Sequence, residues 1–164
     1  MNSNNQQAQE NPKCNCRNKN TCPMPGKCLT PSLIYQAQVE TNSSKETYIG
    51  LTANTFKERF SGHKSSFKKA ERKKETTLSK HIWALKESNE NYNISWKILS
   101  RAKPYSHVSG VCQLCTREKF LIVFKPELGS LNSRNELLGS CRHKRTNLLI
   151  NHARKNKKKK ARNR

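Results

Sequence analysis

Cysteine is the residue type that most constrains how this chain of 164 residues can fold. Four of its seven cysteines lie within residues 14–28, CNCRNKNTCPMPGKC, where most other residues are polar, proline or glycine. So few apolar side chains bury too little surface to order the segment, which therefore needs a cross-link or a metal ion. Cys14, Cys16, Cys22 and Cys28 follow a C-x-C-x5-C-x5-C pattern that can close a tetrahedral Zn²⁺ site, with disulfides as the alternative.

The three remaining cysteines indicate a second zinc site. Cys112 and Cys115 are separated by two residues and supply half of a four-ligand site. Cys141 and His143 can supply the other half, and His107 is the alternative fourth ligand. The N-terminal segment is polar and lacks the apolar core of a signal peptide, so we expect an intracellular protein whose thiols stay reduced and bind metal.

Hydrophobic periodicity predicts a small α+β domain. Alternating β-prone residues indicate three strands that form an antiparallel sheet, and apolar residues at helical spacing indicate three flanking helices, in the order β-β-α-α-β-α. The expected elements are strands at 33–40 and 47–51, helices at 55–69 and 77–88, a strand at 93–100 and a helix at 112–124.

The composition divides the chain into four parts. We expect residues 1–13 to be disordered, residues 14–30 to form an irregular zinc-binding segment, and residues 31–146 to form the α+β domain. The domain would end in loops with one short helix near 134–138. Residues 147–164 are rich in lysine and asparagine and are expected to form a disordered basic tail.

The charge of the chain points to an anionic partner. Thirty-three Lys and Arg residues against 11 Asp and Glu give a formal net charge of +22. Such a charge favours nucleic acid, DNA or RNA, as the partner, with an acidic membrane surface as the rival. No apolar run approaches the roughly 18 residues of a membrane span. The KNKKKKARNR tail resembles a nuclear localisation signal, so we expect a nuclear protein.

Two tyrosines are expected on one face of the hairpin. If the turn 41–46 pairs Glu40 with Thr47, then Val39 lies opposite Tyr48. Because side chains alternate between faces along a strand, Tyr35, Tyr48 and Gly50 then share one sheet surface. The alternative is that both tyrosines are ordinary half-buried strand residues.

Arg59 and His63 are four residues apart and therefore share a face of the helix expected at 55–69. An arginine can hold a phosphate oxygen and offset transition-state charge, and a histidine can orient a water molecule or the phosphate. The alternatives are a solvated basic face for Arg59, and for His63 a place in the apolar stripe of Phe56, Phe60 and Phe67.

Glu118 shares a helix face with three apolar residues, Leu114, Leu121 and Ile122. A carboxylate on an apolar face is rarely buried without a partner, and a divalent cation would supply one. A single carboxylate suits Mg²⁺ or Mn²⁺, because such an ion keeps several water ligands and binds substrate phosphate. An ion pair with a nearby lysine or arginine is the alternative.

These residues resemble the GIY-YIG nuclease family over residues 33–137. Leu33-Ile34-Tyr35 and Tyr48-Ile49-Gly50 are similar to its two naming motifs, although Leu33 stands where glycine is usual. The family also places an arginine and a histidine on its first helix, a glutamate on a later helix and an asparagine after it. Arg59, His63, Glu118 and Asn132 match these positions in order. The phrases CNCRNKNTCP, SKHIWALK, CQLCTREK and CRHK resemble the endonuclease domain of Penelope-like retroelements.

The resemblance implies that residues 31–146 form a GIY-YIG domain that hydrolyses phosphodiester bonds in DNA. It implies that Tyr35, assisted by Tyr48 and His63, positions or deprotonates the attacking water, with the metal ion on Glu118. Asn132 would hold either the active face or the turn at 132–134, and a simple turn cap is the alternative. The sequence does not decide which group takes the proton, whether one or two strands are cut, or the oligomeric state. The alternatives are a non-catalytic zinc-containing nucleic-acid-binding protein and a structure-specific repair nuclease of the same fold.

Overall fold

The structure is a computed structural model that describes residues 14–133, Cys141 and His143. The expectations for residues 1–13, for a helix near 134–138 and for the tail 147–164 lie outside the described residues. The described part is an α+β fold in the expected order, with three short 3₁₀ turns added. Its elements are η1 (Lys19–Thr21), β1 (Pro31–Thr41), β2 (Lys45–Thr55), α1 (Phe56–Lys68), η2 (Ala70–Arg72), α2 (Thr77–Glu87), β3 (Tyr92–Arg101), α3 (Gln113–Phe124) and η3 (Pro126–Leu128).

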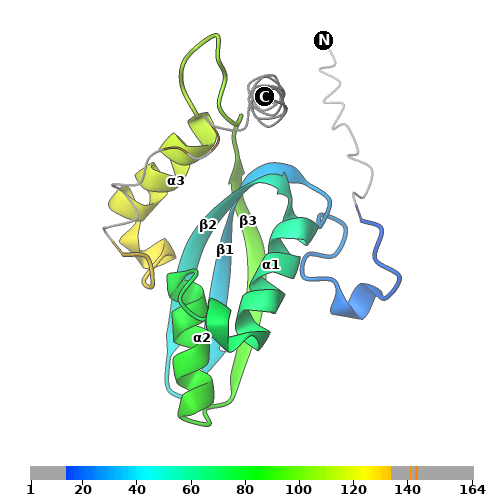
Figure 1. The fold of residues 1–164 in the computed structure, drawn as a ribbon, viewed down its shortest axis with the longest axis vertical. Coiled ribbons are helices and arrows are strands. Elements are labelled where there is room, and N and C mark those ends of the chain that lie inside the picture. Colours follow the sequence, from blue (N-terminus) through cyan, green and yellow to red (C-terminus); the bar gives the residue numbers. More distant parts are fainter. Residues whose placement is uncertain (1–13, 134–140, 142, 144–164) are drawn as a thin grey trace, which may run out of the picture.

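The three strands form one antiparallel sheet in the order β2-β1-β3, so that β1 is central (Figure 1). The expected pairing of Glu40 with Thr47 is wrong, because Glu40 pairs with Lys45. The turn is tighter than expected because the Thr41 hydroxyl accepts the backbone N–H groups of Ser43 and Ser44, at 3.2 and 3.0 Å. Both strands of the hairpin consequently extend beyond the expected ranges.

The register differs from the expected one by two residues, which leaves every side chain on its expected face. Tyr35 lies directly opposite Gly50, and Ala37 lies opposite Tyr48. Tyr35, Tyr48 and Gly50 therefore share a sheet face, as the alternation of the strands predicts.

Helices cover both faces of the sheet. α1 and α2 pack on the face that carries Tyr35, and α3 packs on the opposite face and on the β2 side (Figure 1). The core under α1 and α2 contains the buried residues Met24, Leu33, Tyr35, Ala37, Val39, Tyr48, Phe56, Leu78, Ile82 and Leu85. The smaller core under α3 contains Ile34, Ile49, Cys112 and Leu114.

The cysteine-rich segment is joined to the beginning of α1. The backbone N–H of Lys57 donates to the Cys28 carbonyl at 2.7 Å, and that of Phe56 donates to Thr30 at 3.1 Å. A capping box between Thr55 and Glu58 satisfies further N–H groups of the first turn. The start of α1 is thus held by the cysteine-rich segment as well as by its own cap.

The outer edge of β2 is covered by the chain that follows η3. The Leu131 N–H donates to the Thr47 carbonyl at 2.9 Å. The Asn132 side chain accepts from the Ile49 N–H at 2.7 Å and donates to the Ile49 carbonyl at 2.9 Å. These bonds satisfy backbone groups that an open edge strand would expose.

Candidate active site and metal centres

Tyr35 lies at the centre of the candidate active site and has no solvent-exposed surface. Its ring packs against Phe56, Trp96 and His63, with centroid distances of 5.2, 5.8 and 5.8 Å. Phe56 begins α1, His63 lies two turns further along it, and Trp96 projects from β3. The phenol is therefore fixed by two neighbouring elements as well as by its own strand.

A chain of hydrogen bonds runs through the Tyr35 hydroxyl. Arg59 Nε–H donates to the phenol oxygen at 2.9 Å, and the phenol lies 2.7 Å from His63 Nε2. Burial, reinforced by the nearby Arg59 charge, lowers the pKa of His63 to about 3. His63 is therefore neutral, so that its Nε2 accepts the phenol proton and its own proton resides on Nδ1.

The phenol of Tyr35 is also neutral in this arrangement. Burial raises the pKa of Tyr35 to about 12, although the charge and the hydrogen bond of Arg59 oppose the shift. The negative charge of Glu118 raises this pKa by a smaller amount. Ionising Tyr35 would therefore require additional positive charge beside its oxygen.

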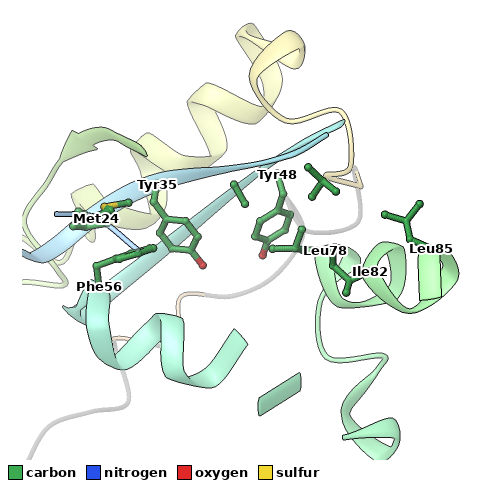
Figure 2. Packing of buried hydrophobic residues seen from close by; sticks show 10 residues of the cluster. Met24, Tyr35, Tyr48, Phe56, Leu78, Ile82 and Leu85 are labelled. Carbon is green, nitrogen blue, oxygen red and sulfur yellow. The ribbon is translucent and has the colours of Figure 1, made fainter. Parts of the chain in front are cut away.

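Tyr48 and Arg59 complete the cluster on this face. Tyr48 is 6% exposed, and its ring centroid lies 6.2 Å from that of His63. Figure 2 shows the Tyr35 and Tyr48 rings on the same side of the sheet. Burial lowers the pKa of Arg59, but the interactions with Tyr35, and to a smaller extent with Tyr48, outweigh burial and raise this pKa overall. Arg59 is thus held by both phenols, so the alternative of a solvated basic face does not hold for this side chain.

Gly50 makes room for the Tyr35 ring. A Cβ atom at Gly50 would lie 2.4 Å from the phenol oxygen and 2.5 Å from Cζ. Real Cβ atoms do not approach other heavy atoms so closely, so any larger residue would displace the ring or the strand. The glycine is therefore required by the position of the phenol.

Glu118 is half-buried on α3, and the apolar residues that share its face pack beneath the helix as expected. Among the described residues it belongs to no group of three or more metal-ligating side chains. A divalent ion at Glu118 would therefore take one carboxylate oxygen from this cluster and complete its shell with water and phosphate oxygens. Mg²⁺ is commonly bound in this way, so the donor set fits such an ion.

Asn132 holds the strand that carries Tyr48 and Gly50. Its amide forms two hydrogen bonds with the backbone of Ile49, which lies between those two residues. A Cβ atom at Gly129 would lie 2.6 Å from the Asn132 Oδ1, so the approach of the loop also depends on a glycine. These contacts make Asn132 a positioning residue that fixes the edge strand of the site.

The first cysteine cluster has the geometry of a metal site. The Sγ atoms of Cys14, Cys16, Cys22 and Cys28 lie within 4.8 Å of one another. Three of their separations are 3.3, 3.7 and 3.7 Å. Tetrahedral zinc with Zn–S bonds of about 2.3 Å places its sulfur ligands about 3.8 Å apart, so the cluster could hold Zn²⁺.

The second cluster joins Cys112, Cys115, Cys141 and His143, whose ligand atoms also lie within 4.8 Å of one another. The His143 Nδ1 lies 3.4 Å from Cys112 Sγ and 3.3 Å from Cys115 Sγ. This cluster could also hold zinc. His107 is instead exposed and packs against the Tyr105 ring, with a centroid distance of 4.8 Å. His143 is therefore the fourth member, as expected.

The two clusters lie at the beginnings of the helices that carry the candidate active residues. Cys28 accepts a hydrogen bond from the second residue of α1, which also carries Arg59 and His63. Cys112 is the N-cap of α3, and Cys115 lies in its first turn, three residues before Glu118. Metal at either cluster would therefore restrain the helix from which these side chains project.

Three residues important for this geometry were not recognised from the sequence. Trp96 lies within the strand expected at 93–100, and Phe56 was expected only as part of a helical stripe. No local sequence pattern marks Gly129, because a glycine is needed there only to make room for the Asn132 side chain. Their roles depend on contacts between distant segments.

None of the helices that the structure describes is long and apolar enough to span a membrane. Comparisons with protein-family models, with curated proteins and with solved structures found no match to this chain.

Proposed function

We propose that this chain is a metal-dependent endonuclease that hydrolyses phosphodiester bonds in DNA. The observation that carries the proposal is the convergence of a phenol, a guanidinium and an imidazole at the Tyr35 hydroxyl, with hydrogen-bonding distances of 2.9 and 2.7 Å. Tyr48 lies on the same face, and Glu118 acts electrostatically on Tyr35. The resemblance to the GIY-YIG family, and to the endonuclease domain of Penelope-like retroelements, supports the same activity and a retroelement origin.

Arg59 is suited to bind the scissile phosphate. Its Nε–H is used by Tyr35 and another N–H is used by Tyr48, so at most three of the five N–H donors of the guanidinium remain in the planar array. Those donors can bind phosphate oxygens while Nε continues to hold the phenol. The fixed positive charge would then stabilise the negative charge that develops on the phosphate in the transition state.

Tyr35 and His63 form a path for the proton of the attacking water. The phenol oxygen accepts from Arg59 and donates its proton toward His63, which leaves one lone pair that can accept a hydrogen bond from water. As the water oxygen bonds to phosphorus, its proton would pass to the Tyr35 oxygen and the phenol proton to His63 Nε2. The low pKa of His63 opposes this transfer, so the negative charge that develops on the phosphate must drive it. The leaving oxygen is displaced from phosphorus with the electron pair of the broken bond.

Glu118 is the residue that would hold Mg²⁺ or Mn²⁺. When bound, such an ion supplies positive charge that stabilises the leaving oxygen and counteracts the raised pKa of Tyr35. Glu118 would hold the ion from α3, and metal at Cys112 and Cys115 would restrain the beginning of that helix.

A non-catalytic nucleic-acid-binding protein is the second candidate. The complete burial of Tyr35 favours it, because an attacking water must reach the phenol oxygen. The net charge of +22 suits either function, since it supplies binding that is independent of sequence and weakened by salt. Activity must therefore be measured directly.

The test is the nicking of supercoiled plasmid by the zinc-loaded chain in Mg²⁺. Glu118→Gln and Tyr35→Phe should each reduce the nicking rate by at least about a hundred-fold, as expected for removal of a group that acts in the transition state. Glu127→Gln and Tyr105→Phe make the same chemical changes outside the cluster and should nick at the wild-type rate.

Equal nicking by Glu118→Gln and by the wild type would refute the assignment of that residue. Binding of plasmid without nicking, in both Mg²⁺ and Mn²⁺, would support the non-catalytic candidate. A loss of nicking in the two control variants as well would show that the loss is not specific to the proposed cluster.

A further inference from the structure

A cavity of about 510 Å³ lies between α3 and the chain that follows β3. We call it the α3 groove. Its apolar lining comes from Ala102, Val111, Phe120 and Leu121. None of these residues belongs to the Tyr35 cluster, and none is a ligand of either cysteine cluster. The groove is therefore a separate feature of the surface.

Aromatic surface is exposed at the α3 groove. Phe120 is 53% exposed, and the neighbouring Phe124 is 68% exposed. Their ring centroids lie 4.7 Å apart, one helical turn along α3. Large exposed apolar surfaces of this kind mark binding sites more often than isolated exposed residues do.

The groove is also positively charged. Arg117 and Lys125 line it from α3, and Arg101 lines it from the end of β3. Among the described residues that form the lining, none is acidic. A ligand that fits must therefore combine flat apolar groups with negative charge.

We propose that the α3 groove binds unpaired nucleotides of a single-stranded nucleic-acid segment. The flat faces of the bases would stack on Phe120, and the phosphates would lie beside Arg117 and Lys125. Stacking on exposed aromatic rings combined with basic side chains is the way that proteins bind single strands without reading their sequence. In a duplex the base faces are already stacked on one another, so the groove selects for unpaired bases.

The position of the groove connects it with the candidate active site. Arg117 precedes Glu118 on α3, and successive residues of an α-helix point about 100° apart around its axis. Arg117, which lines the groove, thus points about 100° from Glu118 around the helix, and Phe120 points to nearly the opposite side from Glu118. A strand in the α3 groove would therefore reach the candidate active site along the Arg117 flank of the helix. Its identification as a substrate contact rests on the proposed nuclease function, and it predicts a substrate with an unpaired segment beside the cleaved bond.

The test measures binding of a fluorescent single strand of about ten nucleotides to the full zinc-loaded chain, without added divalent metal. A strand of equal length and charge that lacks its bases is the matched probe. We expect Phe120→Ala to weaken binding of the intact strand by about 5- to 100-fold, the range measured when an aromatic stacking partner is removed. The same variant should bind the base-free strand as the wild type does.

Val123→Ala is the control variant, because Val123 is 51% exposed on α3 but does not line the groove. It should bind both probes as the wild type does. Arg117→Gln should weaken binding of both probes, since both carry phosphates. Circular dichroism of each variant would establish that α3 remains folded, as the exposure of the substituted side chains predicts.

The proposal is overturned if Phe120→Ala and the wild type bind the intact strand equally, or if Phe120→Ala weakens both probes to the same extent. The first outcome would indicate that the groove binds a ligand of another class, such as an acidic peptide. If the chain binds the probes as predicted but does not nick plasmid, the groove proposal stands and the nuclease proposal is refuted. If the chain nicks plasmid but Phe120→Ala binds the intact strand as the wild type does, the nuclease proposal stands and the groove proposal is refuted.

Discussion

Replacing Gly50 with alanine tests whether the Tyr35 hydroxyl occupies the position on which the site depends. The new Cβ would lie 2.4 Å from the phenol oxygen and 2.5 Å from Cζ. The ring cannot move away freely, because Phe56 and Trp96 pack against it. Overpacking of this kind costs about 1–3 kcal/mol.

Two further effects adjust this value. Displacing the phenol from His63 loses a hydrogen bond worth about 1 kcal/mol. Replacing glycine within a strand restores about 0.5–1 kcal/mol, because alanine has less backbone freedom in the unfolded chain. We therefore expect Gly50→Ala to lower the free energy of unfolding by about 1–3 kcal/mol, with loss of plasmid nicking.

Gly62→Ala is the matched control. Gly62 lies within α1, and a Cβ there would meet no atom within 4 Å. Alanine is the better helix former by about 1 kcal/mol, so this variant should be more stable and should retain activity. Both variants would be unfolded with urea after loading with zinc, and unfolding would be followed by tryptophan fluorescence. Equal stability and equal activity of the two variants would refute the close approach of Tyr35 to Gly50.

Two further predictions concern protons and zinc. The pKa of His63 is lowered from 6.5 to about 3, so the unfolded chain binds its proton at a higher pH than the folded chain does. The free energy of unfolding should therefore fall as the pH decreases below about 6.5, by up to about 1.4 kcal/mol per pH unit, and His63→Gln should remove this part of the slope. If urea unfolding gave the same dependence of stability on pH for the wild type and for His63→Gln, this prediction would be contradicted. Elemental analysis should find two zinc ions per chain, one for each cysteine cluster. Cys28→Ser and Cys115→Ser should each lose one ion while the other cluster keeps its own, and a folded wild-type chain without zinc would exclude both sites.

The sequence predicted the elements and the faces of the sheet because these depend on short-range periodicity. The hairpin register was wrong by two residues, since the tight turn depends on hydroxyl contacts of Thr41 that periodicity does not reveal. Tyr35, Tyr48 and Gly50 still share a face, because the side chains of a strand repeat every two residues. Cluster membership was predictable for the cysteines, since their spacing and number left few combinations.

The remaining features depend on contacts between segments that are distant in the chain. The interaction of Asn132 with Ile49 requires the chain after η3 to reach the outer edge of β2, which no local pattern indicates. The raised pKa of Tyr35 follows from its complete burial, which the strand pattern alone does not indicate. Phe120 and Phe124 stand outside the apolar face of α3 at a spacing of four residues, a signal that the sequence contained and that was overlooked.

The central claim is that one divalent ion binds at Glu118 beside the phenols of Tyr35 and Tyr48. Anomalous diffraction from zinc-loaded crystals soaked in Mn²⁺ measures this directly, because manganese and zinc are distinguished by wavelength. We predict a manganese peak on the Glu118 carboxylate, with water completing the shell of the ion. Manganese bound elsewhere on the chain, with none at Glu118, would contradict the claim.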